Sequence, residues 1–299
     1  MRVVYIGGYG HSGSTLLNIM LGQAPGIMGA GELFRLAGAA WSREEFCSCG
    51  VALPRCPTWN GIVDHWTAHV GGDAVARYHR LQRACERWPI PVRENGLWQD
   101  YAGHTIGLFT AIRDVTGCAT IVDSSKIPAR ARALAQVSGL DLRLVHLVRD
   151  GRGVAWSMRR RMAPDPRAGI QAGKRERSVI RTALMWMWTN LMVERIARAL
   201  APERAVRVTY EALAEDPATT LERLGSAIGA DLSAVSRMLS QGAPLAPGHV
   251  MAGNRLRMHD ALRLRPDLEW QARLPEEQRR LVERLCRPVL RRYGYPAAA

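Results

Sequence analysis

The 299-residue sequence has few of the features that mark several large classes of protein. It holds six cysteines, too few for a disulfide scaffold in a chain of this length. Phenylalanine occurs only three times, and the chain has no aromatic-rich nucleic-acid motif. No run approaches the roughly 20 apolar residues that span a membrane, and the N-terminus lacks the apolar segment of a signal peptide. We therefore predict a cytoplasmic protein with no membrane span and no nucleic-acid partner.

Lysine is also scarce, although the chain is strongly basic. Of its 41 basic residues only Lys126 and Lys174 are lysines, and the others are arginines. The net charge of +14 favours anionic partners, such as nucleotides and phosphorylated or sulfated substrates. Because arginine is the usual basic residue here, the lysine at position 126 is a candidate functional residue.

Residues 8–15 read Gly-Tyr-Gly-His-Ser-Gly-Ser-Thr and have the form of a phosphate-binding loop. They follow a short apolar run and precede a helix-like segment. In that context the glycines let backbone N–H groups close around an anion, and the helix N-terminus adds a favourable dipole. The spacing matches G-x-x-x-x-G-K-[ST], except that Ser14 replaces the lysine that reaches the β- and γ-phosphates. An anion with fewer phosphates than a triphosphate is therefore the better expectation.

Short apolar strands alternate with helices along most of the chain. We predict strands at 2–7, 120–123, 142–148 and 205–208. The predicted helices are 14–22, 101–116, 128–137, 151–161, 177–200, 217–229, 232–239 and 275–292. Residues 40–100, which are rich in Trp, Pro, Gly and Cys, are predicted to form an irregular or helical insertion. This pattern is typical of an α/β fold, a P-loop-type parallel sheet flanked by helices, in one domain over residues 1–299.

The polar motifs come directly after predicted strands, where parallel sheets bind their ligands. Ser124, Ser125 and Lys126 follow the strand at 120–123. Arg149, which can bind a phosphate through two parallel hydrogen bonds, follows the strand at 142–148. One shared anion site explains these motifs and the 8–15 loop more simply than three separate sites.

The motifs resemble those of the sulfotransferase family that uses 3′-phosphoadenosine 5′-phosphosulfate (PAPS). The similarity is closest to bacterial members and the tyrosylprotein branch, which share the Arg-Asp-Gly-Arg motif found here at Arg149-Asp150-Gly151-Arg152. Arg149 and Ser157 have the spacing of the family's 3′-phosphate motif. The segment that resembles its 5′-phosphosulfate loop is His11-Ser12-Gly13-Ser14-Thr15. The resemblance implies the sulfotransferase fold and PAPS as the donor co-substrate.

The resemblance also implies further donor-binding residues. They are Gly10, which adjoins the 5′-phosphosulfate loop, and Ser125, which precedes Lys126. The segment 248–257 resembles the loop that closes over the 3′-phosphate in relatives, and its candidate residues are Asn254, Arg255 and Arg257. An ordinary solvated loop is the alternative for this segment.

Three residues are candidates for the transfer chemistry. Glu32 stands where tyrosylprotein-type relatives have a catalytic Glu, and we expect it to deprotonate the acceptor; a helix-start carboxylate is the alternative. His11 occupies the position of the family's Lys or Arg that stabilises the leaving oxygen, but an imidazole titrates near neutrality. We therefore expect Lys126 to supply permanent charge. The alternatives are a loop-capping role for His11 and a surface salt bridge for Lys126.

These observations predict a sulfotransferase that moves a sulfuryl group from PAPS to a hydroxyl of a small-molecule or carbohydrate acceptor by in-line displacement. A singly charged sulfuryl group needs less neutralisation than a γ-phosphate, so we expect no metal. The insertion at 40–100 would lie on the acceptor side. The basic residues within 152–181 are expected to form a solvated face, with a rim that binds an anionic acceptor as the alternative. A P-loop kinase using ATP–Mg and a catalytically silent nucleotide-binding module are the alternatives. The sequence specifies neither the acceptor nor the oligomeric state.

Three cysteines of the insertion, Cys47, Cys49 and Cys56, lie close together in the sequence. Their spacing departs from common structural zinc patterns, and no fourth ligand is evident apart from His65 or His69. Buried thiols or one local disulfide are therefore the preferred interpretation, with zinc as the alternative.

Overall fold

The strand β1 (Arg2–Gly7) lies at the centre of a parallel sheet. The computed structural model describes residues 1–87, 95–161, 163–165, 171, 173, 175–259, 261–264 and 266–295. Its strands form a five-stranded sheet in the order β2-β3-β1-β4-β5. The other strands are β2 (Ile27–Gly31), β3 (Thr120–Lys126), β4 (Asp141–Val148) and β5 (Ala205–Thr209). All neighbouring strands in it are parallel, which confirms the predicted α/β fold.

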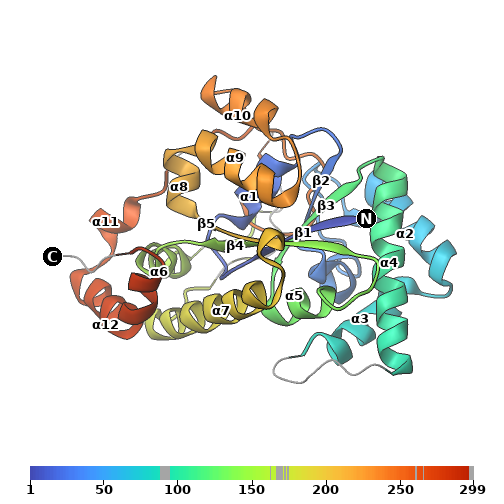
Figure 1. Ribbon diagram of the computed structural model, residues 1–299, viewed down its shortest axis with the longest axis horizontal. Helices are drawn as coiled ribbons and strands as arrows, with labels where there is room; N and C mark the ends of the chain where they lie inside the picture. Colours follow the sequence, from blue (N-terminus) through green and yellow to red (C-terminus); the bar gives the residue numbers. More distant parts are fainter. Residues whose placement is uncertain are drawn as a thin grey trace.

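Helices cover both faces of the sheet (Figure 1). On one face, Val4 and Ile6 of β1 join a core cluster with α1 (Ser14–Leu21) and α9 (Pro217–Ile228). On the other, Val3 and Tyr5 join a cluster with α4, α5 and α7. Alternate strand residues point to opposite faces, so one strand serves both clusters. The remaining bounds are α2 (Pro57–Val70), α3 (Ala74–Cys85), α4 (Gly96–Thr116), α5 (Pro128–Leu134), α6 (Gly151–Arg159), α7 (Val179–Ala199), α8 (Tyr210–Glu215), α10 (Ser233–Ser240), α11 (Glu269–Arg273) and α12 (Glu276–Arg292).

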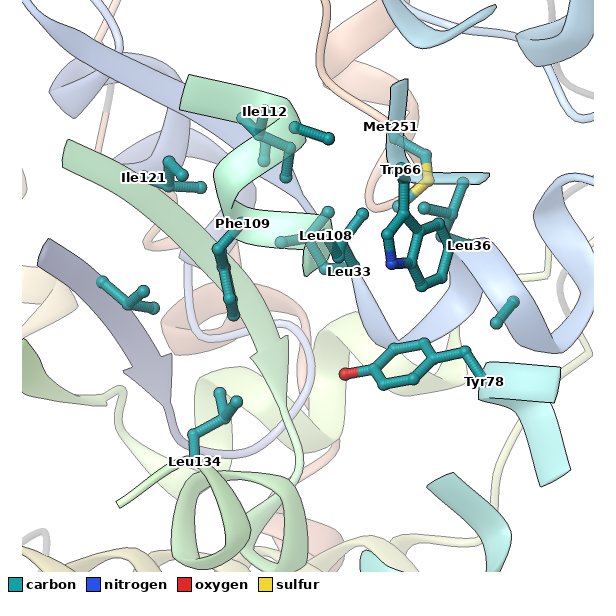
Figure 2. Packing of buried hydrophobic residues seen from close by; sticks show 14 of the residues in the cluster. Leu33, Leu36, Trp66, Tyr78, Leu108, Phe109, Ile112, Ile121, Leu134 and Met251 are labelled. Carbon is teal, nitrogen blue, oxygen red and sulfur yellow. The ribbon is translucent and has the colours of Figure 1, made fainter. Parts of the chain in front are cut away.

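The 40–100 region is largely helical and packs against α4 beyond the β2 edge of the sheet (Figure 1). Figure 2 shows Trp66 and Tyr78 of this region in the same buried cluster as Leu108 and Phe109 of α4. The rings of Trp66 and Tyr78 meet edge to face, with centroids 5.3 Å apart. Residues 88–94 of the predicted insertion lie outside the described part. No helix in the described part of the chain is both long and apolar enough to cross a bilayer.

The sequence-based assignment missed β2, α8 and α11. Strand β2 reads Ile-Met-Gly-Ala-Gly, whose glycines and alanine have low strand propensity. Tertiary packing makes it a strand: it pairs with β3, and a Cβ at Gly29 would lie 2.6 Å from the carbonyl oxygen of Asn18 in α1. This strand ends directly before Glu32, so the missed element is the one that positions a predicted catalytic residue.

Arg130 of α5 forms a fully buried ion-pair network beneath the sheet. Its guanidinium lies 2.8 Å from Asp123 and 2.6 Å from Glu86. The substitution Arg130→Leu would leave the buried carboxylates of Asp123 and Glu86 without a cation. We expect the free energy of unfolding to fall by about 3–5 kcal/mol in urea denaturation.

Arg77→Leu is the matched control, because Arg77 pairs with Asp100 at 2.5 Å but both side chains are about half exposed. We expect its effect to stay below about 1 kcal/mol. Equal losses in the two variants would show that burial does not decide the strength of the Arg130 network.

His146 of β4 gives the fold a pH dependence. Its ring is buried, and Nε2 lies 3.1 Å from the Asn190 side-chain oxygen. Burial lowers the pKa of His146 to about 4. The unfolded chain takes up this proton below about pH 6.5, whereas the folded chain does not until about pH 4, so stability is lost as the pH falls through that window.

We expect this residue to account for a loss of about 2–3 kcal/mol between pH 7 and pH 4.5. Urea denaturation of the native chain and of His146→Gln at several pH values measures it. The variant should lose less stability over this range. Identical pH dependence in both proteins would contradict the assignment.

Candidate active site

The carboxyl ends of all strands of the sheet meet at one cavity of about 640 Å³. The loop after β1 lines it, together with Glu32 after β2 and Lys126 at the end of β3. Arg149 follows β4 and Tyr210 follows β5. Parallel strands place their carboxyl ends at one edge, so motifs far apart in the sequence share this cavity.

The loop between β1 and α1 has a backbone suited to an anion. His11 and Gly13 have φ of 66° and 89°, in the left-handed region. Gly13 is the N-cap of α1 and has no side chain to occupy the first N–H groups of the helix, which therefore point to the cavity edge. A Cβ at position 13 would lie 2.6 Å from the Tyr210 ring, so only glycine fits. Gly10, Ser14 and Thr15 also line the cavity.

Ser12 does not line the cavity, but it is buried beside it. Its hydroxyl oxygen has no hydrogen-bond partner among the described residues. An unpartnered buried hydroxyl in an anion-binding loop fits a ligand oxygen.

A segment far along the chain closes over this loop. The amide of Asn254 donates a hydrogen bond to Thr15 Oγ1 at 3.0 Å. A Cβ at Gly253 would lie 2.9 Å from the same oxygen and 3.7 Å from Glu32 Oε1. Asn254 lines the cavity, whereas Arg255 is exposed and lies outside it.

Arg257 also lies outside the cavity. Its guanidinium donates a 2.6 Å hydrogen bond to the carbonyl of Phe46, and burial lowers its pKa. The structure therefore gives this predicted donor-binding residue a different contact, between the 248–257 loop and the 40–100 region.

Lys126 and Glu32 form an ion pair at the cavity. The Lys126 Nζ lies 2.6 Å from Glu32 Oε1 and 2.9 Å from the carbonyl of Ser124. Lys126 has φ of 70°, a strained backbone that turns its side chain toward Glu32. Both side chains remain partly exposed, at 16% and 20%, so a ligand in the cavity can reach them.

Ser125 points away from the cavity. Its hydroxyl donates a short hydrogen bond to Asp123 and accepts one from the Phe34 amide at 2.9 Å. It therefore braces β3 against the segment after β2, and this predicted donor-binding hydroxyl does not line the cavity.

Arg149 lines the same cavity and is held in a defined position beside the loop. Its guanidinium stacks 4.4 Å above the Tyr210 ring, contacts the Asp267 carboxylate at 3.1 Å and donates to the His11 carbonyl at 3.2 Å. Its Nε is buried without a partner in the described structure. Burial raises the pKa of the Tyr210 phenol, although Arg149 opposes the shift, so the ring remains neutral.

His11 and Ser157 are in direct contact, since His11 Nδ1 lies 2.7 Å from Ser157 Oγ. The resemblance assigned them to opposite ends of the donor. In the structure, the 5′-side loop and the 3′-side helix α6 are joined by this hydrogen bond.

Several cavity residues were not predicted as site residues. They include Tyr9, Arg35, Arg177, Tyr210, Arg263 and Asp267. Tyr210 directly follows β5, so the rule that ligands bind after parallel strands was sufficient to find it. Asp267 lies in an irregular segment and has no comparable sequence signal.

Comparison with known proteins shows which family this chain belongs to. The sequence profile of the sulfotransferase family matches residues 4–234. A comparison with curated proteins finds no match. The fold is similar to the sulfotransferase domain from the curacin biosynthetic pathway, with TM-score 0.51 and 13% identity over 99% of this chain and 98% of that one.

Weaker structural similarity extends to two further proteins. The sulfotransferase domain of the Synechococcus PCC 7002 olefin synthase has TM-score 0.47 and 17% identity over 96% of this chain and 94% of that one. Mouse sulfotransferase SULT7A1, complexed with PAP, has TM-score 0.44 and 12% identity over 97% and 83%. Because the family profile matches well over half of the sequence, this chain belongs to the sulfotransferase family and is a sulfotransferase enzyme.

Proposed function

We propose that this enzyme transfers a sulfuryl group from PAPS to a hydroxyl of a small-molecule or carbohydrate acceptor and releases adenosine 3′,5′-bisphosphate. The observation that carries the proposal is the pair of separate anion-binding places in one cavity: the N-terminus of α1 and the guanidinium of Arg149. A donor with separate phosphate groups on the 3′ and 5′ positions of its ribose matches two such places, whereas one loop alone cannot hold both.

The residues at each of the two anion-binding positions suit the phosphate group that we assign to it. Around the 5′-phosphosulfate, the amides of the loop and the unpartnered Ser12 hydroxyl offer donors. Around the 3′-phosphate, Arg149 offers a planar fork held by Tyr210. The Asp267 carboxylate now contacts this fork, so a bound phosphate has to take its place.

The arrangement supports in-line displacement. The acceptor oxygen forms a bond to sulfur as the bond from sulfur to the phosphate oxygen breaks, and that oxygen keeps the electron pair. Glu32 takes the acceptor's proton. Lys126 and the first amides of α1 stabilise the charge that develops on the leaving phosphate. His11, beside Ser157, is placed to donate a hydrogen bond to the same group.

The rim of the cavity supports an anionic acceptor. Arg35, Arg177 and Arg263 line it, and Leu256 and Leu262 add apolar surface. We infer an acceptor that joins an apolar body to an anionic group.

A kinase function finds less support in the same residues. Ser14 takes the position of the phosphate-loop lysine. Asp123, the carboxylate within β3 that could serve a nucleotide-bound Mg²⁺, is occupied by Arg130 and Ser125 instead.

Isothermal titration calorimetry with adenosine 3′,5′-bisphosphate and with ATP–Mg tests the donor. We expect tight binding of the bisphosphate and weak binding of ATP–Mg. Preferential ATP–Mg binding would overturn the proposal. Incubation with labelled PAPS and a panel of hydroxyl acceptors then separates an active enzyme from a silent binding module, which would give no labelled product with any acceptor.

A further inference from the structure

The structure brings a fourth metal-ligating side chain to the three clustered cysteines. Cys47, Cys49 and Cys56 meet His249, which comes from the segment that closes over the donor loop. Their ligand atoms all lie within 4.8 Å of one another. His65, which the sequence offered as a ligand, instead lies 3.4 Å from Asp114. We propose that these four residues bind a structural zinc ion.

Three of the distances between the ligand atoms are close to those of a tetrahedral zinc site. Zn–S bonds of about 2.3 Å and Zn–N bonds of about 2.05 Å place neighbouring sulfur atoms about 3.8 Å apart and sulfur and nitrogen about 3.5 Å apart. The His249 Nδ1 lies 3.4 Å from Cys56 Sγ and 3.7 Å from Cys47 Sγ. The Cys49 and Cys56 sulfurs are 3.6 Å apart.

Other uses of these side chains explain the geometry less well. A disulfide needs its sulfurs about 2.05 Å apart, and the cysteines of this cluster are all free. One ring nitrogen carries either one proton or one lone pair, so it can form a good hydrogen bond with only one of the two sulfurs beside it. A metal ion between the four groups satisfies them all at once.

The surrounding backbone holds the ligands in place. Ser48 donates a 2.7 Å hydrogen bond to the Gly248 carbonyl and accepts one of 2.7 Å from the Val250 amide. Trp59 donates to the carbonyl of His249 at 2.8 Å. Both sides of the site are therefore clamped together, and its ligands are pre-positioned for the ion.

The charge balance also suits zinc. Three cysteines bind as thiolates, release their protons and leave the Zn–Cys₃His unit with one negative charge. The buried guanidinium of Arg257 donates a hydrogen bond to the carbonyl of Phe46, the residue before Cys47, and supplies a compensating positive charge. This gives a role to an arginine that lies outside the donor cavity.

Four protein ligands complete the coordination of zinc, so the ion would be structural and not a site for water or substrate. It would join the 40–100 region to the segment that leads to Gly253 and Asn254. Met251, two residues after His249, accepts a 3.0 Å hydrogen bond from the Glu32 amide. The metal would thus set the position of the donor-closing loop beside the predicted base.

Metal analysis of the whole chain, purified without chelators or metal-affinity resin, tests the proposal. We expect about one zinc ion per chain. Cys47→Ser and Cys56→Ser should lose at least about nine-tenths of it. Cys118→Ser is the matched control, because Cys118 is a free cysteine outside the cluster, and it should keep full occupancy.

A second measurement covers variants that fail to fold. The native chain, stripped of metal and kept reduced, is titrated with Co²⁺, and a tetrahedral thiolate site gives intense d–d absorption and a sulfur-to-cobalt charge-transfer band. A native chain with no bound zinc and no such spectrum would overturn the proposal, as would a Cys49–Cys56 disulfide found by peptide mass spectrometry. Both measurements are made without PAPS, so the zinc proposal can fail while the proposed function stands.

Discussion

Glu32→Gln is expected to lower kcat by about 10²–10⁴-fold, with little change in the affinity for adenosine 3′,5′-bisphosphate. Glutamine keeps the shape of the side chain and can still accept a hydrogen bond from Lys126, 2.6 Å away in the native protein. It cannot take the acceptor's proton. Steady-state kinetics with saturating PAPS, together with calorimetry of the bisphosphate, separates the two effects.

Glu44→Gln is the control, because Glu44 is exposed, lies outside the cavity and pairs only loosely with Arg55 at 3.6 Å. It should have native kinetics. If Glu32→Gln instead kept the native kcat, Glu32 would not be the base. If kcat and bisphosphate affinity fell together, its role would be to hold Lys126 and the loop.

Arg149→Ala is expected to weaken binding of adenosine 3′,5′-bisphosphate by about 100-fold or more, because it removes a buried charged partner of the 3′-phosphate. Arg149→Lys keeps the charge but loses the planar fork, so most of the loss should remain. Calorimetry measures both. Arg255→Ala removes an exposed arginine outside the cavity and should bind as the native protein does.

Calorimetry with adenosine 5′-phosphate, which lacks the 3′-phosphate, distinguishes a contact to the 3′-phosphate from a structural role of Arg149. Arg149 also contacts the carbonyl of His11, so its loss can disturb the loop. A disturbed loop weakens both nucleotides equally, whereas a lost 3′-phosphate contact weakens only the bisphosphate. Equal weakening of both ligands would refute the assignment of Arg149 to the 3′-phosphate.

Much of the site was predictable because its motifs are local. Residues 8–15 combine glycines, hydroxyls and a helix start within a few positions, and Arg149 follows the most apolar strand. Parallel strands all point the same way, so residues that follow them must gather at one edge. The family and fold predicted from these motifs are confirmed.

Three of the predicted donor-binding side chains lie outside the cavity. Ser125, Arg255 and Arg257 lie near the predicted motifs in sequence, but their side chains turn to Asp123, to solvent and to Phe46. Backbone direction and packing set these orientations, and neither can be read from a residue's position in a motif.

The sequence by itself determined the parallel sheet, the glycine-rich loop after β1 and the family, because each depends on spacings of a few residues. Only the tertiary structure decided which distant groups meet. It paired Lys126 with Glu32, joined His11 to Ser157 and brought His249 to cysteines about 200 positions earlier. Such contacts depend on the order of the strands in the sheet and on the paths of the loops, and neither can be predicted from a local sequence pattern.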